Sequence, residues 1–259
     1  MLAHRRRGKD LDIYECWSRA RNRCCFVKAL RPDRLESPAR RRLVREARLL
    51  LSFAHPHLIR AYELLPAGVD GSPLLLLEPL DGPTLDQRLR EGGRLPVRDL
   101  VILGRHLCSV VGYLHRHHYL HLGIQASTII ADGDRTRLID LSWARRPGRI
   151  TRGWGTSYQI SPEQARGGRL TTAADVWGVG LMLYEAATGH HPFQPSLSFD
   201  GPRLVRFRQL STVAPPVQSL RQLPVAVGTA LDACLQVCPS DRPTLTELDA
   251  CLAAAADPS

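Results

Sequence analysis

The 259-residue chain is nearly devoid of lysine: Lys9 and Lys28 are the only two among 35 basic residues, and the other 33 are arginines. It also lacks any run of about 18 apolar residues, which excludes a helix that spans a membrane. The basic start, Met1 to Arg7, has no apolar stretch of the kind found in a signal peptide. We therefore expect a cytoplasmic location and no membrane insertion.

Metal-binding cysteine pairs are missing as well. The seven cysteines contain no C-x-x-C pair and their number is odd, which favours free thiols over disulfides or a zinc site. His115 and His118 share a helix face, but no cysteine or acidic residue accompanies them. We expect His115, His117, His118 and His121 to be exposed and not to be metal ligands.

Arginine gives the chain a net charge of +10. Such a charge can attract nucleic acid or acidic lipid. The arginines are scattered, however, and concentrate locally only at residues 5–7 and 40–48. We therefore expect no nucleic-acid binding.

The hydrophobic pattern changes near residue 80. Short apolar runs bounded by turn residues predict strands before this point, together with one helix over residues 39–53. After it, amphipathic stripes over residues 97–118 and 173–188 predict long helices. The sequence therefore predicts an α+β protein with a strand-rich part, residues 1–80, and a mainly helical part, residues 81–259.

The segment from His121 to Ile130 reads H-L-G-I-Q-A-S-T-I-I and follows the long amphipathic stretch. It resembles the catalytic loop of protein kinases, H-R-D-L-K-P-x-N-I-L. In this alignment the histidine is kept. The catalytic base falls on Gly123, the lysine on Gln125 and the metal-binding asparagine on Thr128.

Other motifs of the same family follow in the family's order. Together they resemble bacterial serine/threonine kinases and imply a bilobal protein kinase-like fold, with a small antiparallel β lobe carrying one main helix and a larger, mainly helical lobe. The matching segments are Phe26-Val27-Lys28 (V-A-I-K), Glu46 (the ion-pair glutamate), Leu77-Glu78-Pro79-Leu80 (the hinge), Asp140-Leu141-Ser142 (D-F-G), Ser161-Pro162-Glu163 (the end of the activation segment), Asp175-Val176-Trp177-Gly178 (D-V-W-S) and Asp241-Arg242-Pro243 (R-P-T).

The resemblance implies a nucleotide site around Lys28. This lysine would hold the phosphates of ATP, Glu46 would pair with it, and Asp140 would be a weak candidate ligand for Mg²⁺. The hinge residues Glu78 and Leu80 would border the adenine. The residues also permit a structural interpretation, in which the Lys28–Glu46 pair pins the helix to the sheet and Asp140 caps the following turn.

Two features argue against an open nucleotide site. Fitted to G-x-G-x-x-G, the phosphate-covering loop keeps only Gly8, with Arg6 and Leu11 at the other glycine positions. Phe26 stands where V-A-I-K has alanine, the roof of the adenine pocket.

Alternate residues of a strand share a face, so Phe26 and Lys28 should face the same cleft. The ring would then pack against Ile13 above and Ile130 below and fill the pocket. A one-residue shift of register would turn it to the other face of the sheet.

Four further residues match positions that stabilise the family's fold. Asp175 would accept hydrogen bonds from the catalytic-loop backbone. His121 would stack with Leu50 and Leu141 between the lobes. Glu163 and Arg242 would form a buried salt bridge.

Two functions remain open. One is a pseudokinase that binds a protein partner of unknown identity and needs no cofactor. The alternative is an active serine/threonine kinase that uses ATP and Mg²⁺ in a non-standard site.

Overall fold

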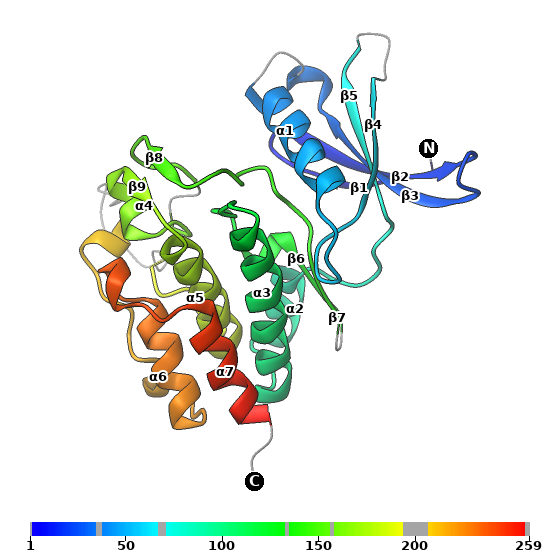
Figure 1. Ribbon diagram of the computed structural model, residues 1–259. Helices are drawn as coiled ribbons and strands as arrows, with labels where there is room; N and C mark the ends of the chain where they lie inside the picture. The colour runs from blue at the N-terminus through cyan, green and yellow to red at the C-terminus, as the bar shows by residue number, and fades with distance from the viewer. Residues whose placement is uncertain are drawn as a thin grey trace, which may run out of the picture. The chain divides into compact units, whose positions relative to one another are not determined.

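The computed structural model describes residues 2–34, 38–66, 71–132, 135–155, 158–193 and 207–256. The chain forms two units (Figure 1), which are described separately. Unit 1 contains Met1–Asp81 and Ile139–Trp143, and unit 2 contains Gly82–Leu138 and Ala144–Ser259. The sequence had assigned all residues after 80 to the large lobe, so the grouping of Ile139–Trp143 with unit 1 is a difference.

Unit 1 is a five-stranded antiparallel sheet with one main helix. The strand order is β1-β2-β3-β5-β4. The elements are β1 (Ala3–Arg7), β2 (Leu11–Ser18), β3 (Arg23–Leu30), the short 3-10 turn η1 (Pro32–Arg34), α1 (Pro38–Ser52), β4 (Ala61–Pro66) and β5 (Pro73–Leu77).

Helix α1 forms because its apolar residues recur at helical spacing. Ala39, Leu43, Ala47 and Leu50 are each at most 1% exposed, and they form one stripe. The stripe packs beside β4 and β5. This packing fixes the helix on the sheet and places Glu46, on the same helix, in the interior.

Unit 2 is mainly helical and contains two short two-stranded ribbons. Its helices are α2 (Leu85–Gly92), α3 (Val97–Arg116), α4 (Pro162–Arg166), α5 (Ala173–Thr188), α6 (Val225–Cys234) and α7 (Leu245–Ala256). Its strands are β6 (Ile129–Asp132), β7 (Arg135–Leu138), β8 (Gly148–Ile150) and β9 (Gly168–Leu170), and its 3-10 turns are η2 (Ala126–Thr128), η3 (Arg208–Leu210), η4 (Val217–Ser219) and η5 (Pro239–Asp241).

Helix α5 is the centre of unit 2, and almost all of its residues are buried. It contacts α3 and α6. Its approach to α6 is close, because a Cβ atom at Gly180 would lie 2.2 Å from the Cβ of Cys234. The buried helix begins with the segment that carries Asp175 and so supports the loop after α3.

The α+β class is confirmed, with an antiparallel sheet in unit 1 and a mainly helical unit 2. Helix α2 begins with a capping box, in which Thr84 accepts a hydrogen bond from the backbone N–H of Gln87. Among the residues that the structure describes, no helix is long and apolar enough to cross a membrane.

Candidate functional site

The structure brings Lys28 and Glu46 together in the interior of unit 1, with the partly exposed Asp140 beside them. The Lys28 Nζ lies 2.8 and 2.9 Å from the two carboxylate oxygens of Glu46. It also lies 3.7 Å from Oδ1 of Asp140. Lys28 comes from β3, Glu46 from α1, and Asp140 from the segment that follows β7. The ion pair therefore joins the helix to the sheet, as the pinning interpretation requires.

Burial governs the ionisation of this cluster. It opposes the charge on Lys28, but the carboxylates of Asp140 and Glu46 outweigh it and raise the pKa of the lysine. Burial raises the pKa of Glu46 to about 7, and Asp140 adds to this rise while Lys28 opposes it. Both pKa shifts favour retention of protons: that of Glu46 because the group is buried, and that of Lys28 because two carboxylates lie near its ammonium.

The segment Ile139–Trp143 is held on α1 by further contacts. The backbone N–H of Leu141 donates to Glu46 at 3.4 Å, and Arg45 donates to the carbonyl of Ser142 at 2.5 Å. The Arg42 guanidinium lies 5.7 Å from the ring centroid of Trp143. These contacts explain why the segment belongs to unit 1. The sequence analysis missed them, although Arg42 and Arg45 lie three residues apart and hence on one helix face.

Asp140 caps the turn after it. Its Oδ1 accepts a hydrogen bond of 2.6 Å from the backbone N–H of Ser142, which supports the structural interpretation of this residue. The same oxygen is the one that faces Lys28. Within the described ranges, no group of three or more His, Cys, Asp or Glu side chains could hold a metal ion.

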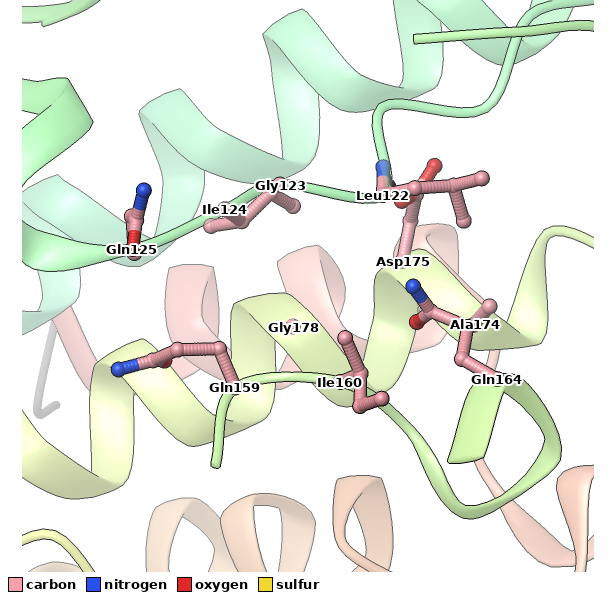
Figure 2. Close-up of a pocket in the computed structure, with 10 residues that line it drawn as sticks. All are labelled: Leu122, Gly123, Ile124, Gln125, Gln159, Ile160, Gln164, Ala174, Asp175 and Gly178. Carbon is pink, nitrogen blue, oxygen red and sulfur yellow. Dashed lines mark hydrogen bonds between the residues drawn. The ribbon is translucent and has the colours of Figure 1, made fainter. Parts of the chain in front are cut away.

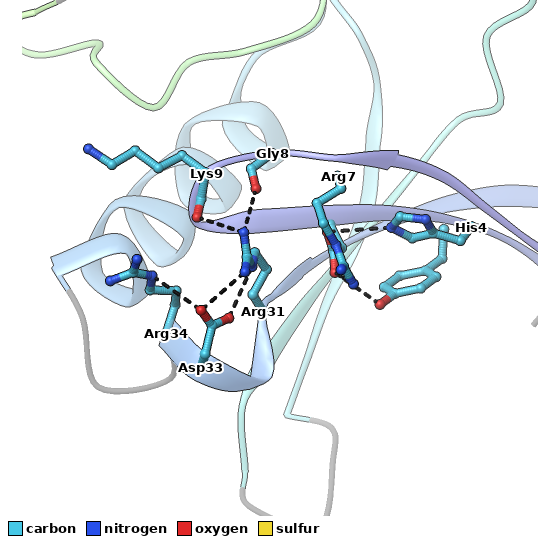
Figure 3. A network of polar contacts seen from close by, with 9 residues as sticks. His4, Arg7, Gly8, Lys9, Arg31, Asp33 and Arg34 are labelled. Atoms are coloured by element: carbon cyan, nitrogen blue, oxygen red, sulfur yellow. Dashed lines mark hydrogen bonds and ion pairs between the residues drawn. The ribbon is translucent and has the colours of Figure 1, made fainter.

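The turn between β1 and β2 is short and tightly bonded. Gly8 donates its N–H to the carbonyl of Leu11 at 2.8 Å. The Arg31 guanidinium donates to the carbonyls of Gly8 and Lys9 (Figure 3), and Asp33 in turn accepts from Arg31. Arg6 and Leu11, at the other two glycine positions, lie in the strands themselves. A phosphate-binding loop needs open backbone N–H groups, and that of Gly8 is already used.

Phe26 and Lys28 lie on one face of the sheet. In the register of β2 and β3, Phe26 opposes Glu15 and Lys28 opposes Ile13. Their partners on β5 are also two residues apart, so β3 has no irregularity between Phe26 and Lys28. The one-residue shift considered above is therefore wrong. Phe26 is half-buried. Ile130 belongs to unit 2, so the filling of an adenine pocket by Phe26 stays a prediction.

The hinge residues lie at the end of unit 1. The backbone N–H of Glu78 donates to the carbonyl of Arg60, and the Glu78 carboxylate accepts from the N–H of Arg60 at 2.9 Å. Leu80 is half-buried. The role of both residues in adenine binding stays a prediction.

In unit 2, Asp175 fixes the loop after α3. Its carboxylate accepts hydrogen bonds of 2.8 Å from the backbone N–H groups of both His121 and Leu122. Leu122 has a φ of 58°, a left-handed conformation that costs an ordinary residue about 1–2 kcal/mol. The buried aspartate offsets this strain and sets the path of the loop.

His115 also bonds Asp175, with 2.8 Å between Nε2 and Oδ2. The expectation of exposed histidines is wrong for His115, whose side chain is 12% exposed, and for His121, which is 1% exposed. It is confirmed for His117 and His118, which are exposed. Burial alone would raise the pKa of Asp175, but the bonds from His115 and the loop backbone hold that pKa below its usual range.

Three positions of the loop differ from the kinase pattern: Gly123, Gln125 and Thr128. Their polar groups form hydrogen bonds within the loop. The Thr128 hydroxyl donates to the carbonyl of Gln125 at 2.9 Å and accepts from the Gln125 N–H at 3.3 Å. The N–H of Gly123 donates to Nδ1 of His121 at 3.1 Å. Thr128 is buried, while Gly123 and Gln125 are half-buried.

A small hollow lies beside this loop, with room for about one water molecule. Figure 2 shows that Gly123 contributes no side chain to it, while the amide groups of Gln125 and Gln159 lie toward one end. The lining residues are Leu122, Gly123, Ile124, Gln125, Gln159, Ile160, Gln164, Ala174, Asp175 and Gly178.

Glu163 and Arg242 form a two-pronged ion pair in unit 2. Both N–O distances are 2.8 Å. Arg242 also donates to the carbonyls of Ala173 and Gln236, and its side chain is fully buried. One guanidinium therefore connects α4 to the start of α5 and to the segment before α7.

The motif order and these contacts agree with a comparison against protein families, in which residues 7–251 match the protein kinase domain. The chain belongs to the protein kinase domain family.

Its curated relatives include bacterial serine/threonine kinases. The serine/threonine-protein kinase PkaA of Streptomyces coelicolor is 31% identical over 218 residues, which cover 80% of this chain and 38% of that protein. PknB of Mycobacterium leprae is 29% identical over 177 residues, covering 64% of this chain and 28% of that protein. A probable serine/threonine-protein kinase of Clostridium acetobutylicum is 23% identical over 244 residues, covering 91% and 36%. The chain thus spans about a third of the length of these relatives.

We predict that the Glu163–Arg242 pair is critical for stability. Glu163→Gln should lower the free energy of unfolding by about 3–5 kcal/mol, because it leaves the Arg242 charge buried without its carboxylate. The measurement is urea unfolding followed by circular dichroism.

The matched control for this prediction is Asp249→Asn, which removes the carboxylate of an exposed pair with Arg105. It should cost about 1 kcal/mol or less. Equal small costs for both variants would contradict the structural role of the buried pair.

Proposed function

We propose that this domain is a pseudokinase, which acts by binding a protein partner and does not transfer phosphate. The observation that carries the proposal is the catalytic loop. It has Gly123 at the position of the base and no carboxylate between His121 and Ile130. The Thr128 hydroxyl, at the metal position, donates within the loop. Phosphoryl transfer depends on charge placed around the phosphates, and this loop provides no anionic group.

The contacts that stabilise the fold support the same function. The Asp175 bonds to the loop backbone and the Glu163–Arg242 pair involve protein groups alone. The same is true of the Lys28–Glu46 pair. A scaffold requires a defined surface, and these contacts within the protein help to define it.

A second candidate function is an active kinase with a non-standard site. It is favoured by one observation, the Lys28–Glu46 pair with Asp140 at 3.7 Å. The residues present do not fit the family's metal pair, however, because Thr128 replaces the asparagine of that pair and only the aspartate, Asp140, is present. Its Oδ1 is already bonded to the Ser142 backbone.

We predict that the purified domain does not transfer phosphate from ATP to itself or to generic protein substrates, with Mg²⁺ or Mn²⁺. Loss of a positioned base alone slows such reactions by about 10²–10⁴-fold, and Gln125 and Thr128 add further losses. The measurement is incorporation of the labelled γ-phosphate. Labelling by the wild type that disappears in Asp140→Ala would contradict the proposal and favour the active kinase.

We further predict that Phe26 blocks nucleotide binding. The wild type should bind no ATP at micromolar concentration, whereas Phe26→Ala should gain weak binding through Lys28. Because the ring is only half-buried, the substitution should cost about 2 kcal/mol, less than the loss of a fully buried phenylalanine. The measurement is titration of both proteins with ATP by calorimetry.

Phe53→Ala is the matched control, since Phe53 is a half-buried ring of unit 1 that lies beyond the end of α1. It should lower stability without any gain of ATP binding. Micromolar ATP binding by the wild type, unimproved in Phe26→Ala, would show that the ring does not occupy the pocket.

A further inference from the structure

The ribbon of β8 and β9 in unit 2 carries an unusual concentration of positive charge. Figure 1 shows the two strands beside α4. Residues 144–155, which include β8, contain four arginines and no acidic residue. Two more arginines, Arg166 and Arg169, lie just before and in β9. Five of these six side chains are exposed. We call them the arginine ribbon: Arg146, Arg149, Arg152, Arg166 and Arg169.

Two of these arginines are placed directly opposite one another. β8 and β9 are antiparallel, and their register pairs Arg149 with Arg169. The neighbouring pair joins Gly148 to Leu170, which is 1% exposed. Because faces alternate along a strand, one face of the ribbon is anchored by Leu170 and the other presents two guanidinium groups side by side.

This arrangement is unfavourable for the isolated domain, since like charges directly opposite in a ribbon repel. Within the described residues, no carboxylate forms an ion pair with the arginine ribbon. Glu163, the nearest acidic residue along the chain, is held by Arg242. Arginine is the usual basic residue throughout this chain, so its presence here is not in itself informative. The positions of these charges are what support the proposal below.

We propose that the arginine ribbon is a docking surface for an acidic segment of a partner protein. The proposal deepens the proposed function, on which it rests, by naming the surface and the chemistry of the partner. Carboxylates from such a segment would accept paired hydrogen bonds from the guanidinium groups. They would also remove the repulsion between Arg149 and Arg169.

The surface fits a protein segment better than a nucleic acid. Each strand has three residues, so the ribbon is only about 10 Å long. Single-stranded nucleic acid is held by aromatic rings on which bases stack. Two rings beside the ribbon are already covered by its guanidinium groups. The guanidinium of Arg146 lies 5.6 Å from the ring centroid of Tyr119, and that of Arg152 lies 5.9 Å from the ring centroid of Phe207.

The test is a titration of a labelled synthetic peptide in which glutamate and glycine alternate, followed by fluorescence anisotropy. The wild type should bind it, and binding should weaken as salt is raised. The double variant Arg149→Ser, Arg169→Ser should bind it roughly tenfold more weakly or worse. Its melting temperature should be unchanged or higher, because a repulsive pair has been removed.

The control double variant is Arg98→Ser, Arg116→Ser, which removes the same charge from two exposed positions on α3. It should bind the peptide like the wild type. The proposal is overturned if the wild type does not bind the peptide, or if both double variants lose affinity equally. Tighter binding of an oligothymidylate of equal charge would assign the surface to nucleic acid and also overturn it.

Phosphate transfer, measured on the same proteins, separates this proposal from the proposed function. Peptide binding by an enzyme that labels substrates would leave the docking surface in place and refute the pseudokinase. If the protein neither binds the peptide nor transfers phosphate, the docking surface is refuted and the pseudokinase is not.

Discussion

The structure of unit 1 depends on one buried ammonium group. Lys28 bonds both oxygens of Glu46 and lies 3.7 Å from Asp140, so one side chain connects β3, α1 and the segment after β7. Removing it would leave the carboxylate of Glu46 buried without its counter-charge, which is far more costly than the loss of an exposed charge. The segment Ile139–Trp143 stays with unit 1 because it shares this cluster and the arginines of α1.

In unit 2, too, a buried charged side chain connects neighbouring segments, at two places. Asp175 satisfies the backbone of a strained turn, and Arg242 joins three segments through Glu163 and main-chain carbonyls. In both cases a buried charge is fully paired by protein groups, which is the condition under which burial is tolerated. The buried charges therefore hold the fold of each unit, while the segment from His121 to Ile130 contains no carboxylate.

Elements and contacts with strong, local sequence signals could be predicted. Helix α5 follows from its periodicity, and the partners Lys28 and Glu46 were implied by the resemblance to protein kinases. The strands β8 and β9 were not predicted, because three residues are too few to show a period. The bond of His115 to Asp175 was also missed, since a buried histidine and an exposed one at a helix end look alike in sequence. The relation of Phe26 to Ile130 concerns two separate units and remains a prediction.

The central claim is that the cluster around Lys28 is complete without a nucleotide. It is tested most directly by thermal unfolding of the wild-type domain with and without millimolar ATP and Mg²⁺. A ligand that binds the folded state raises its melting temperature by mass action. The account predicts no change in melting temperature, whereas a rise of about 5 °C or more that is absent in Lys28→Met would mean that Lys28 holds phosphates, and would contradict it.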